Sequence, residues 1–119
     1  MSVTVGNVYV VFCYYIKSPH DKISLCVCAS SHFFFWFNSS PARHGIAQIL
    51  IAAGEHHAIT KDCYLDLSGV RVFTPNDIKP GDSRGPVSAA LKARILAALS
   101  SPIKLLPEAH RQLALANLR

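Results

Sequence analysis

The length, composition and charge of the chain exclude several classes of protein. Its 119 residues suffice for one hydrophobic core, so we expect a single domain over residues 1–119. Half of the residues are hydrophobic and 16% are charged, which excludes a disordered or low-complexity chain. The formal net charge of +5 favours an anionic partner such as nucleic acid, although such a charge also serves solubility alone.

Short apolar segments separated by turn residues predict a β-rich body over residues 1–73. Residues 3–15 (VTVGNVYVVFCYY) are rich in β-branched and aromatic residues, as is typical of a strand. A polar loop at residues 17–22 (KSPHDK) then leads to a second strand at residues 23–29 (ISLCVCA). The two strands together predict a hairpin.

Five consecutive aromatic residues at positions 33–37 (FFFWF) predict a third strand that is covered on both faces. The run is far shorter than the roughly 20 apolar residues that a membrane-spanning helix needs, so we expect no membrane insertion. A surface for stacking nucleobases is the alternative. Such surfaces usually alternate aromatic with basic residues, and the run contains no Lys or Arg, which favours a core strand.

Two further segments complete the expected β part. Residues 46–52 predict a fourth strand, bounded by a turn-like segment and by Gly54. Residues 63–73 (CYLDLSGVRVF) predict two short strands joined by a turn or bulge at Ser68 and Gly69.

The last third of the sequence changes to a helical pattern. Residues 74–86 contain several Pro and Gly residues and predict an irregular connection. Residues 87–119 predict helices, with Ser88 as the N-cap of the first and Pro107 in the first turn of the second. The predicted fold class is therefore α+β and mostly β, with a small barrel followed by C-terminal helices.

The cysteines are interpreted as small buried hydrophobic residues. No basic segment precedes the first apolar stretch, as a secretory signal would require, so we expect a cytoplasmic protein with reduced thiols. Cys26 and Cys28 are spaced C-x-C, and Cys13 and Cys63 do not complete a zinc-ribbon spacing. The sequence also lacks a phosphate-binding P-loop. We therefore expect neither a metal ion nor a cofactor.

Basic and hydroxyl-bearing residues gather around the expected strand ends. Cleaving RNA without a metal requires an acceptor for the 2′-hydroxyl proton, a donor for the leaving oxygen and cations for the phosphate. The residues that could supply these groups are Lys22, Asn38, Ser39, Ser40, Arg43, His44, His56, His57 and Arg84. Each of them taken alone is also an ordinary solvated loop residue.

Two parts of the sequence resemble the MazF/PemK-like toxins. The start of that family is similar to GNVYVVFCYY followed by a polar loop and DKISLCVCAS, and its later section is similar to CYLDLSGVRVF followed by GPVSAALKARILAAL. The resemblance covers most of residues 5–100 and marks a divergent member. It implies an SH3-like barrel with a C-terminal helix, a homodimer, and an antitoxin protein that blocks the RNA groove.

The same resemblance implies a toxin of a type II toxin-antitoxin system that cleaves single-stranded RNA without a metal ion. The position of the family's catalytic Arg holds Lys22, a movable point charge in place of a bidentate clamp, and its hydroxyl position falls on Ser39 or Ser40. In this hypothesis Lys22, Ser39 and Ser40 are catalytic, and RNA is bound by Asn38, Arg43, His44, His56, His57 and Arg84. The second hypothesis is a non-catalytic small barrel that binds nucleic acid or protein.

Overall fold

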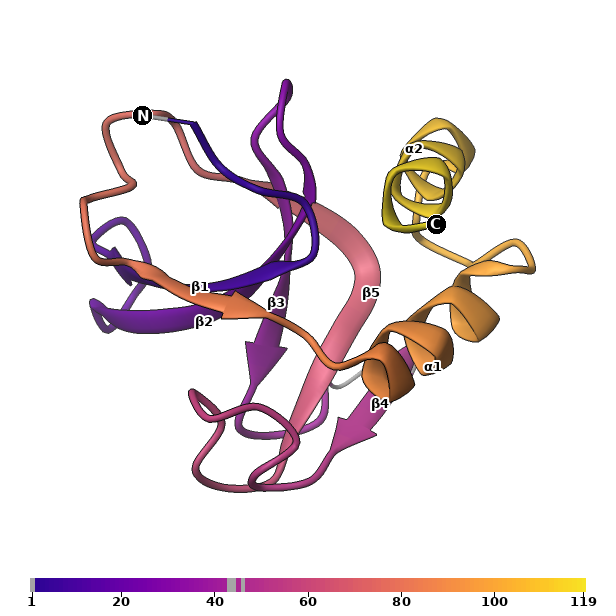
Figure 1. Ribbon diagram of the computed structural model, residues 1–119, viewed down its shortest axis with the longest axis horizontal. Coiled ribbons are helices and arrows are strands. Elements are labelled where there is room, and N and C mark those ends of the chain that lie inside the picture. The colour runs from indigo at the N-terminus through magenta and orange to yellow at the C-terminus, as the bar shows by residue number, and fades with distance from the viewer. Residues whose placement is uncertain (1, 43–44, 46) are drawn as a thin grey trace.

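The structure is a computed structural model that describes residues 2–42, 45 and 47–119. This part of the chain forms β-strands followed by two α-helices (Figure 1). The elements are β1 (Asn7–Cys13), β2 (His20–Cys28), β3 (Phe33–Asn38), β4 (Gln48–Ile51), β5 (Cys63–Val72), β6 (Ser83–Pro86), α1 (Ala89–Leu99) and α2 (Glu108–Leu118). The prediction of a mostly β, α+β fold with C-terminal helices is confirmed.

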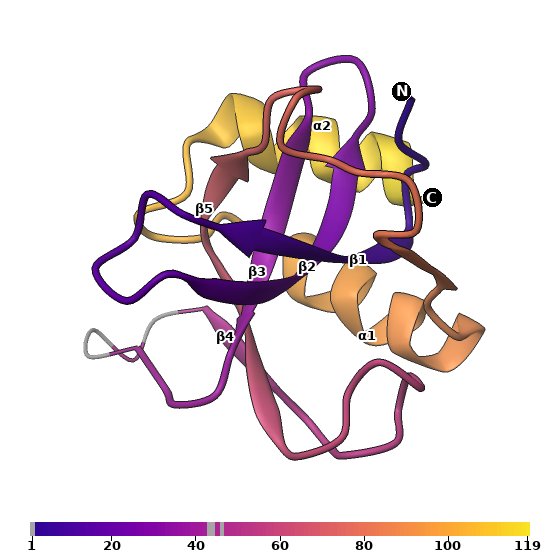
Figure 2. The ribbon, with the colours of Figure 1, turned by 90° about the vertical axis from the view of Figure 1, so that its left-hand side faces the viewer.

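The strands form one curled antiparallel sheet in the order β4-β5-β3-β2-β1-β6. The curl gives the body the shape of a small barrel, with β5 bent strongly along its length (Figure 1). The bend follows from a bulge, because Phe34 pairs with Arg71 and Trp36 pairs with Asp66, so residues 67–70 face a single β3 residue. Both helices lie behind the sheet in Figure 2 and cover one of its faces.

The aromatic run forms the central strand β3, as predicted, and contributes to two clusters of buried side chains. Phe35 and Phe37 pack in the larger cluster, which also contains Leu91 and Ile95 of α1. Phe34 points to the other face of the sheet and packs there in a second cluster. Apolar residues of the strand are therefore buried on both faces, while Phe33 and Trp36 remain partly exposed.

The helices begin where their capping residues predict. Ser88 is the N-cap of α1, and its Oγ accepts a hydrogen bond from the Leu91 N–H at 3.1 Å. Pro107 precedes the first residue of α2. The buried guanidinium of Arg111 donates to the Leu99 carbonyl oxygen at 2.7 Å, which satisfies one free carbonyl at the end of α1 and fixes α2 against it.

Three expectations about the strands need correction. The strand β2 begins at His20, so Lys22 lies inside a strand and not in a loop. The β5 region is one strand that continues through the expected bulge. The strand β6 was not predicted, since its sequence SRGP contains two residues that usually break strands. Among the described strands it pairs only with β1, at the edge of the sheet, where Pro is tolerated because no second partner needs its missing N–H.

All four cysteines are buried and free of disulfide bonds, which confirms their interpretation as buried hydrophobic residues. Among the described residues, no helix is long and apolar enough to span a membrane. Within the same residues, no group of three or more His, Cys, Asp or Glu side chains comes together in a way that could hold a metal ion.

Candidate functional site

A cavity of about 310 Å³ opens where the start of β2, the end of β3 and the start of β5 meet. These three strand ends are neighbours because each antiparallel pair places the start of one strand beside the end of the next. We call this space the rim cavity. Its lining consists of His20, Asp21, Lys22, Ile23, Phe37, Ser39, Thr60, Lys61, Asp62 and Cys63.

Lys22 is the central cation beside the rim cavity. Its Nζ donates a hydrogen bond to Asn38 Oδ1 at 2.9 Å, which links β2 to the end of β3. The side chain is half-buried, and burial lowers the pKa of the Lys22 ammonium below its usual value of 10.5. The charge of Arg71 also lowers this pKa, whereas the carboxylate of Asp66 raises it. Lys22 therefore releases a proton at lower pH than an exposed lysine does.

Two cations from neighbouring strands lie over the ring of Trp36. Lys22 Nζ is 4.8 Å from the ring centroid and the guanidinium carbon of Arg71 is 4.9 Å from it. The aromatic run itself contains no basic residue, which favoured a core strand over a stacking surface. The structure supplies basic residues from β2 and β5, so the absence of Lys and Arg from the run does not exclude stacking on Trp36, which is partly exposed.

Asp66 is the buried carboxylate on the same side of the sheet. It is the β5 residue paired with Trp36, and its Oδ1 accepts hydrogen bonds from the Ser68 N–H at 2.9 Å and the Ser68 hydroxyl at 2.6 Å. These bonds fix the carboxylate inside the bulge. A carboxylate held in this place partly offsets the positive charges of Lys22 and Arg71.

His20 lines the rim cavity two residues before Lys22. Its Nδ1 lies 2.5 Å from the carbonyl oxygen of Ser18. A carbonyl oxygen only accepts hydrogen bonds, so the tautomer that makes this bond donates from Nδ1 and has its acceptor at Nε2. Sequence analysis missed His20. The signal that could have identified it is the strand period of two, which places residues 20 and 22 on the same side of β2.

The structure brings together three of the residues that were predicted to form the site. Lys22 contacts Asn38, and Ser39 lines the rim cavity beside them. Ser40 is exposed on the bend that follows β3. Arg43 and His44 lie outside the described residues. Besides His20, sequence analysis missed Thr60 and Lys61, which reach the rim cavity from the segment before β5, as well as the pair of Trp36 and Arg71.

The structure does not place His56 where it could bind RNA. The side chain is 6% exposed, and its Nε2 donates to the Gly85 carbonyl oxygen at 3.2 Å while its Nδ1 accepts from the Ala58 N–H at 3.1 Å. The Nε2 bond thus holds the segment after β4 against β6, and the Nδ1 bond is local to that segment. His57 is exposed, and its ring centroid lies 4.5 Å from that of His56. We therefore leave His56 out of the candidate site.

Arg84 also lies apart from Lys22. Its guanidinium donates to the Gly81 carbonyl oxygen and lines a second cavity, of about 270 Å³, near Asp77 and Asp82. This cavity neighbours the rim cavity, because Asp21 lines both. The Arg84 guanidinium bonds within its own segment, to Gly81, and Arg84 is not among the residues that line the rim cavity.

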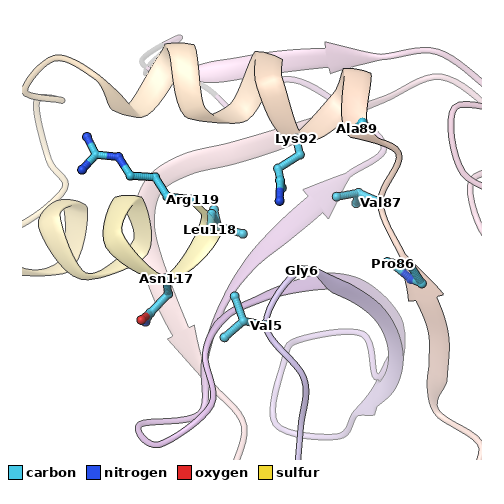
Figure 3. Close-up of a pocket in the computed structure, with 9 residues that line it drawn as sticks. All are labelled: Val5, Gly6, Pro86, Val87, Ala89, Lys92, Asn117, Leu118 and Arg119. Carbon is cyan, nitrogen blue, oxygen red and sulfur yellow. The ribbon is translucent and has the colours of Figure 1, made fainter.

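A third cavity, of about 330 Å³, separates the start of β1 and the end of β6 from the two helices (Figure 3). Figure 3 shows Lys92 pointing from α1 toward Val5, Val87 and Leu118. The lining residues are Val5, Gly6, Pro86, Val87, Ala89, Lys92, Asn117, Leu118 and Arg119, and none of the predicted site residues is among them.

The buried histidine should make the stability of the fold depend on pH. Burial lowers the pKa of His56 below its ordinary value of 6.5, so as the pH falls through that value the unfolded chain takes up a proton before the folded chain does. The free energy of unfolding should therefore fall as the pH is lowered through this value. His56→Gln should weaken this dependence in urea titrations at several pH values. His57→Gln, which changes the exposed neighbour, should leave it intact, and the same slope in all three proteins would contradict the assignment.

The chain matches no protein-family model and no curated protein. The chemistry of the rim cavity and its surroundings is therefore the basis for a function.

Proposed function

We propose that the protein binds single-stranded RNA and cleaves it without a metal ion, as the toxin of a type II toxin-antitoxin pair. The observation that carries this proposal is the meeting of Lys22, Asn38 and Ser39 at one rim, with His20 and Lys61 lining the same cavity. These side chains offer the proton acceptor, proton donor and phosphate-binding groups that RNA cleavage requires. The net charge of +5 favours a polyanionic substrate.

The reaction that this set supports is attack of the RNA 2′-hydroxyl on the adjacent phosphorus. Nε2 of His20 takes the 2′-hydroxyl proton while the bond between the 2′-oxygen and phosphorus forms. The bond from phosphorus to the 5′-oxygen breaks, and the Lys22 ammonium gives its proton to that oxygen. The Ser39 hydroxyl and the Lys61 ammonium hold the phosphate oxygens as charge develops on them.

Asn38 acts as a positioning residue in this scheme, because its side-chain oxygen orients the Lys22 ammonium at 2.9 Å. The lowered pKa of Lys22 fits a proton donor, since a lysine that keeps its proton too strongly transfers it poorly at neutral pH. Among the serines, the lining of the rim cavity favours Ser39 over Ser40 as the hydroxyl that reaches the phosphate.

The test is to incubate the purified protein with a single-stranded RNA oligonucleotide in the presence of EDTA. We expect fragments that end in a 2′,3′-cyclic phosphate and begin with a 5′-hydroxyl, identified by mass spectrometry. An oligonucleotide with one 2′-deoxynucleotide at the cleaved position should remain intact, because the attacking hydroxyl is missing. RNA that stays uncut both with EDTA and with added divalent metal ions would overturn the enzymatic proposal.

A non-catalytic barrel that binds nucleic acid is the second candidate. The two cations beside the partly exposed Trp36 favour it, because attachment to RNA through stacking and charge requires no proton transfer. In the assay above, RNA that binds but remains intact would support this candidate.

A homodimer and an antitoxin partner belong to the same proposal, since the resemblance to the MazF/PemK-like toxins implies both. Large exposed hydrophobic side chains provide apolar surface for such partners. They are Phe12, Tyr14, Tyr15, Leu50, Val72 and Leu105.

A further inference from the structure

We infer that Trp36, Arg71 and Lys22 form a nucleotide subsite, in which one base of single-stranded RNA stacks on the indole ring and the two cations bind the phosphates beside it. The inference rests on the proposed function and adds to it the residues that recognise the substrate. From the sequence, Lys22 was expected to be catalytic, stacking on the aromatic run was the less favoured alternative, and Arg71 was not considered.

The register of the sheet places all three side chains on one face. Ser24 of β2 pairs with Trp36, and Lys22 precedes Ser24 by two residues, so Lys22 and Trp36 share a face. Phe34 precedes Trp36 by two residues and pairs with Arg71 of β5. Three adjacent strands therefore present a cation, an aromatic ring and a second cation side by side.

The indole ring is fixed in orientation yet open to solvent over part of its surface. Its Nε1 is buried, and the ring centroid of Phe73 lies 6.2 Å away with the two planes tilted by 30°. The residue as a whole is partly exposed. A ring that is held at one edge and open elsewhere is preorganised for stacking, because little side-chain entropy is lost when a base binds.

Arg71 is the exposed cation of this subsite. Across the part of the chain that the structure describes, the aromatic ring that its guanidinium lies over is that of Trp36. A base stacks on an aromatic ring more strongly than an exposed cation does, so a base can take the place of Arg71 over the ring. The released guanidinium then pairs with a phosphate in bidentate geometry.

Lys22 connects this subsite to the rim cavity, because the same ammonium lies over Trp36 and bonds to Asn38. A nucleotide that is stacked on Trp36 therefore has one phosphate beside Lys22. That position would hold the RNA strand in a fixed register relative to His20 and Ser39, which line the cavity.

Trp36 is the single tryptophan of the chain, so its fluorescence reports on the subsite directly. The probe is a single-stranded RNA oligonucleotide with 2′-O-methyl groups, which cannot be cleaved by 2′-hydroxyl attack. We expect saturable quenching of the Trp36 emission. An abasic oligonucleotide of the same length and charge should cause little quenching, because it lacks the base.

Two variants test the roles of the side chains. Arg71→Gln should weaken binding of the oligonucleotide by about 10-fold, whereas Lys104→Gln, which removes the same charge from an exposed site between the helices, should change it by less than about 2-fold. Trp36→Leu should weaken binding, measured by fluorescence anisotropy of a labelled oligonucleotide, by about 10- to 100-fold. Arg71→Gln keeps the test valid if Trp36→Leu does not fold.

The outcomes separate this inference from the proposed function. If the protein cleaves unmodified RNA but its emission does not change on binding the probe, the subsite is wrong and the ribonuclease proposal stands. If the protein neither binds nor cleaves RNA, both are wrong. Equal quenching by the abasic probe would also overturn the subsite, since it would show that charge alone produces the signal.

Discussion

Replacing Lys22 with Ala should lower the rate of RNA cleavage by about 10²–10³, the typical cost of losing a preorganised donor at a developing charge. The change removes the half-buried ammonium that is held by Asn38 and that we propose protonates the leaving oxygen. Single-turnover cleavage of a labelled RNA is the measurement. Lys17→Ala is the matched control, because Lys17 is exposed in the loop before β2 and does not line the rim cavity. An equal loss in both variants would show that general charge is responsible.

The pH dependence separates proton donation from charge at this position. Because burial lowers the pKa of Lys22, its ammonium is lost at lower pH than that of an exposed lysine, and the cleavage rate should fall as the pH rises through this value. Lys22→Arg keeps the charge but does not release a proton in this range. It should retain much of the RNA binding, cleave slowly, and lack the alkaline fall in rate. An unchanged pH profile in Lys22→Arg would remove Lys22 from the proton transfer.

The elements that the sequence predicted correctly have causes that are local. The aromatic run at residues 33–37 requires burial on two faces wherever it lies, and its polar flanks define the ends of β3. The hydroxyl of Ser88 caps whichever helix follows it. Such features depend on neighbours along the chain, so they can be inferred without knowing the sheet order.

The features that the sequence did not reveal depend on pairing between distant strands. Residues 83–86 form β6 only because β1 offers them a free edge. Likewise, Arg71 reaches Trp36 because the β5 bulge shifts the register between them. A one-residue change of register would turn Arg71 to the other face, and no local pattern specifies that register.

In the candidate site, too, some residues could be predicted from local sequence and others depend on contacts between distant segments. Lys22, Asn38 and Ser39 were predicted because each adjoins an expected strand end, and the antiparallel pairing brings them to one rim. His56 was expected to bind RNA because it is one of the basic residues beside the expected strand ends. It is instead buried, since both of its ring nitrogens find backbone partners, one of them in β6, which the sequence did not reveal.

The largest effect on stability is expected from Phe35→Ala. Phe35 is 0% exposed and packs in the cluster between the sheet and the helices, so its truncation should lower the free energy of unfolding by about 3–5 kcal/mol. That is a large share of the about 5–15 kcal/mol that stabilises an ordinary domain. Urea titrations monitored by Trp36 emission measure it, because the tryptophan remains in this variant.

Phe12→Ala provides the matched control for this change. Phe12 lies on β1 and is 54% exposed, so the same truncation there should alter the free energy of unfolding by about 0.5 kcal/mol or less. The two variants remove identical side chains from strands of one sheet, and only burial distinguishes them. A loss of similar size in both would mean that Phe35 is not in the core. A large difference would place Phe35 inside the fold, as its burial in the central strand indicates.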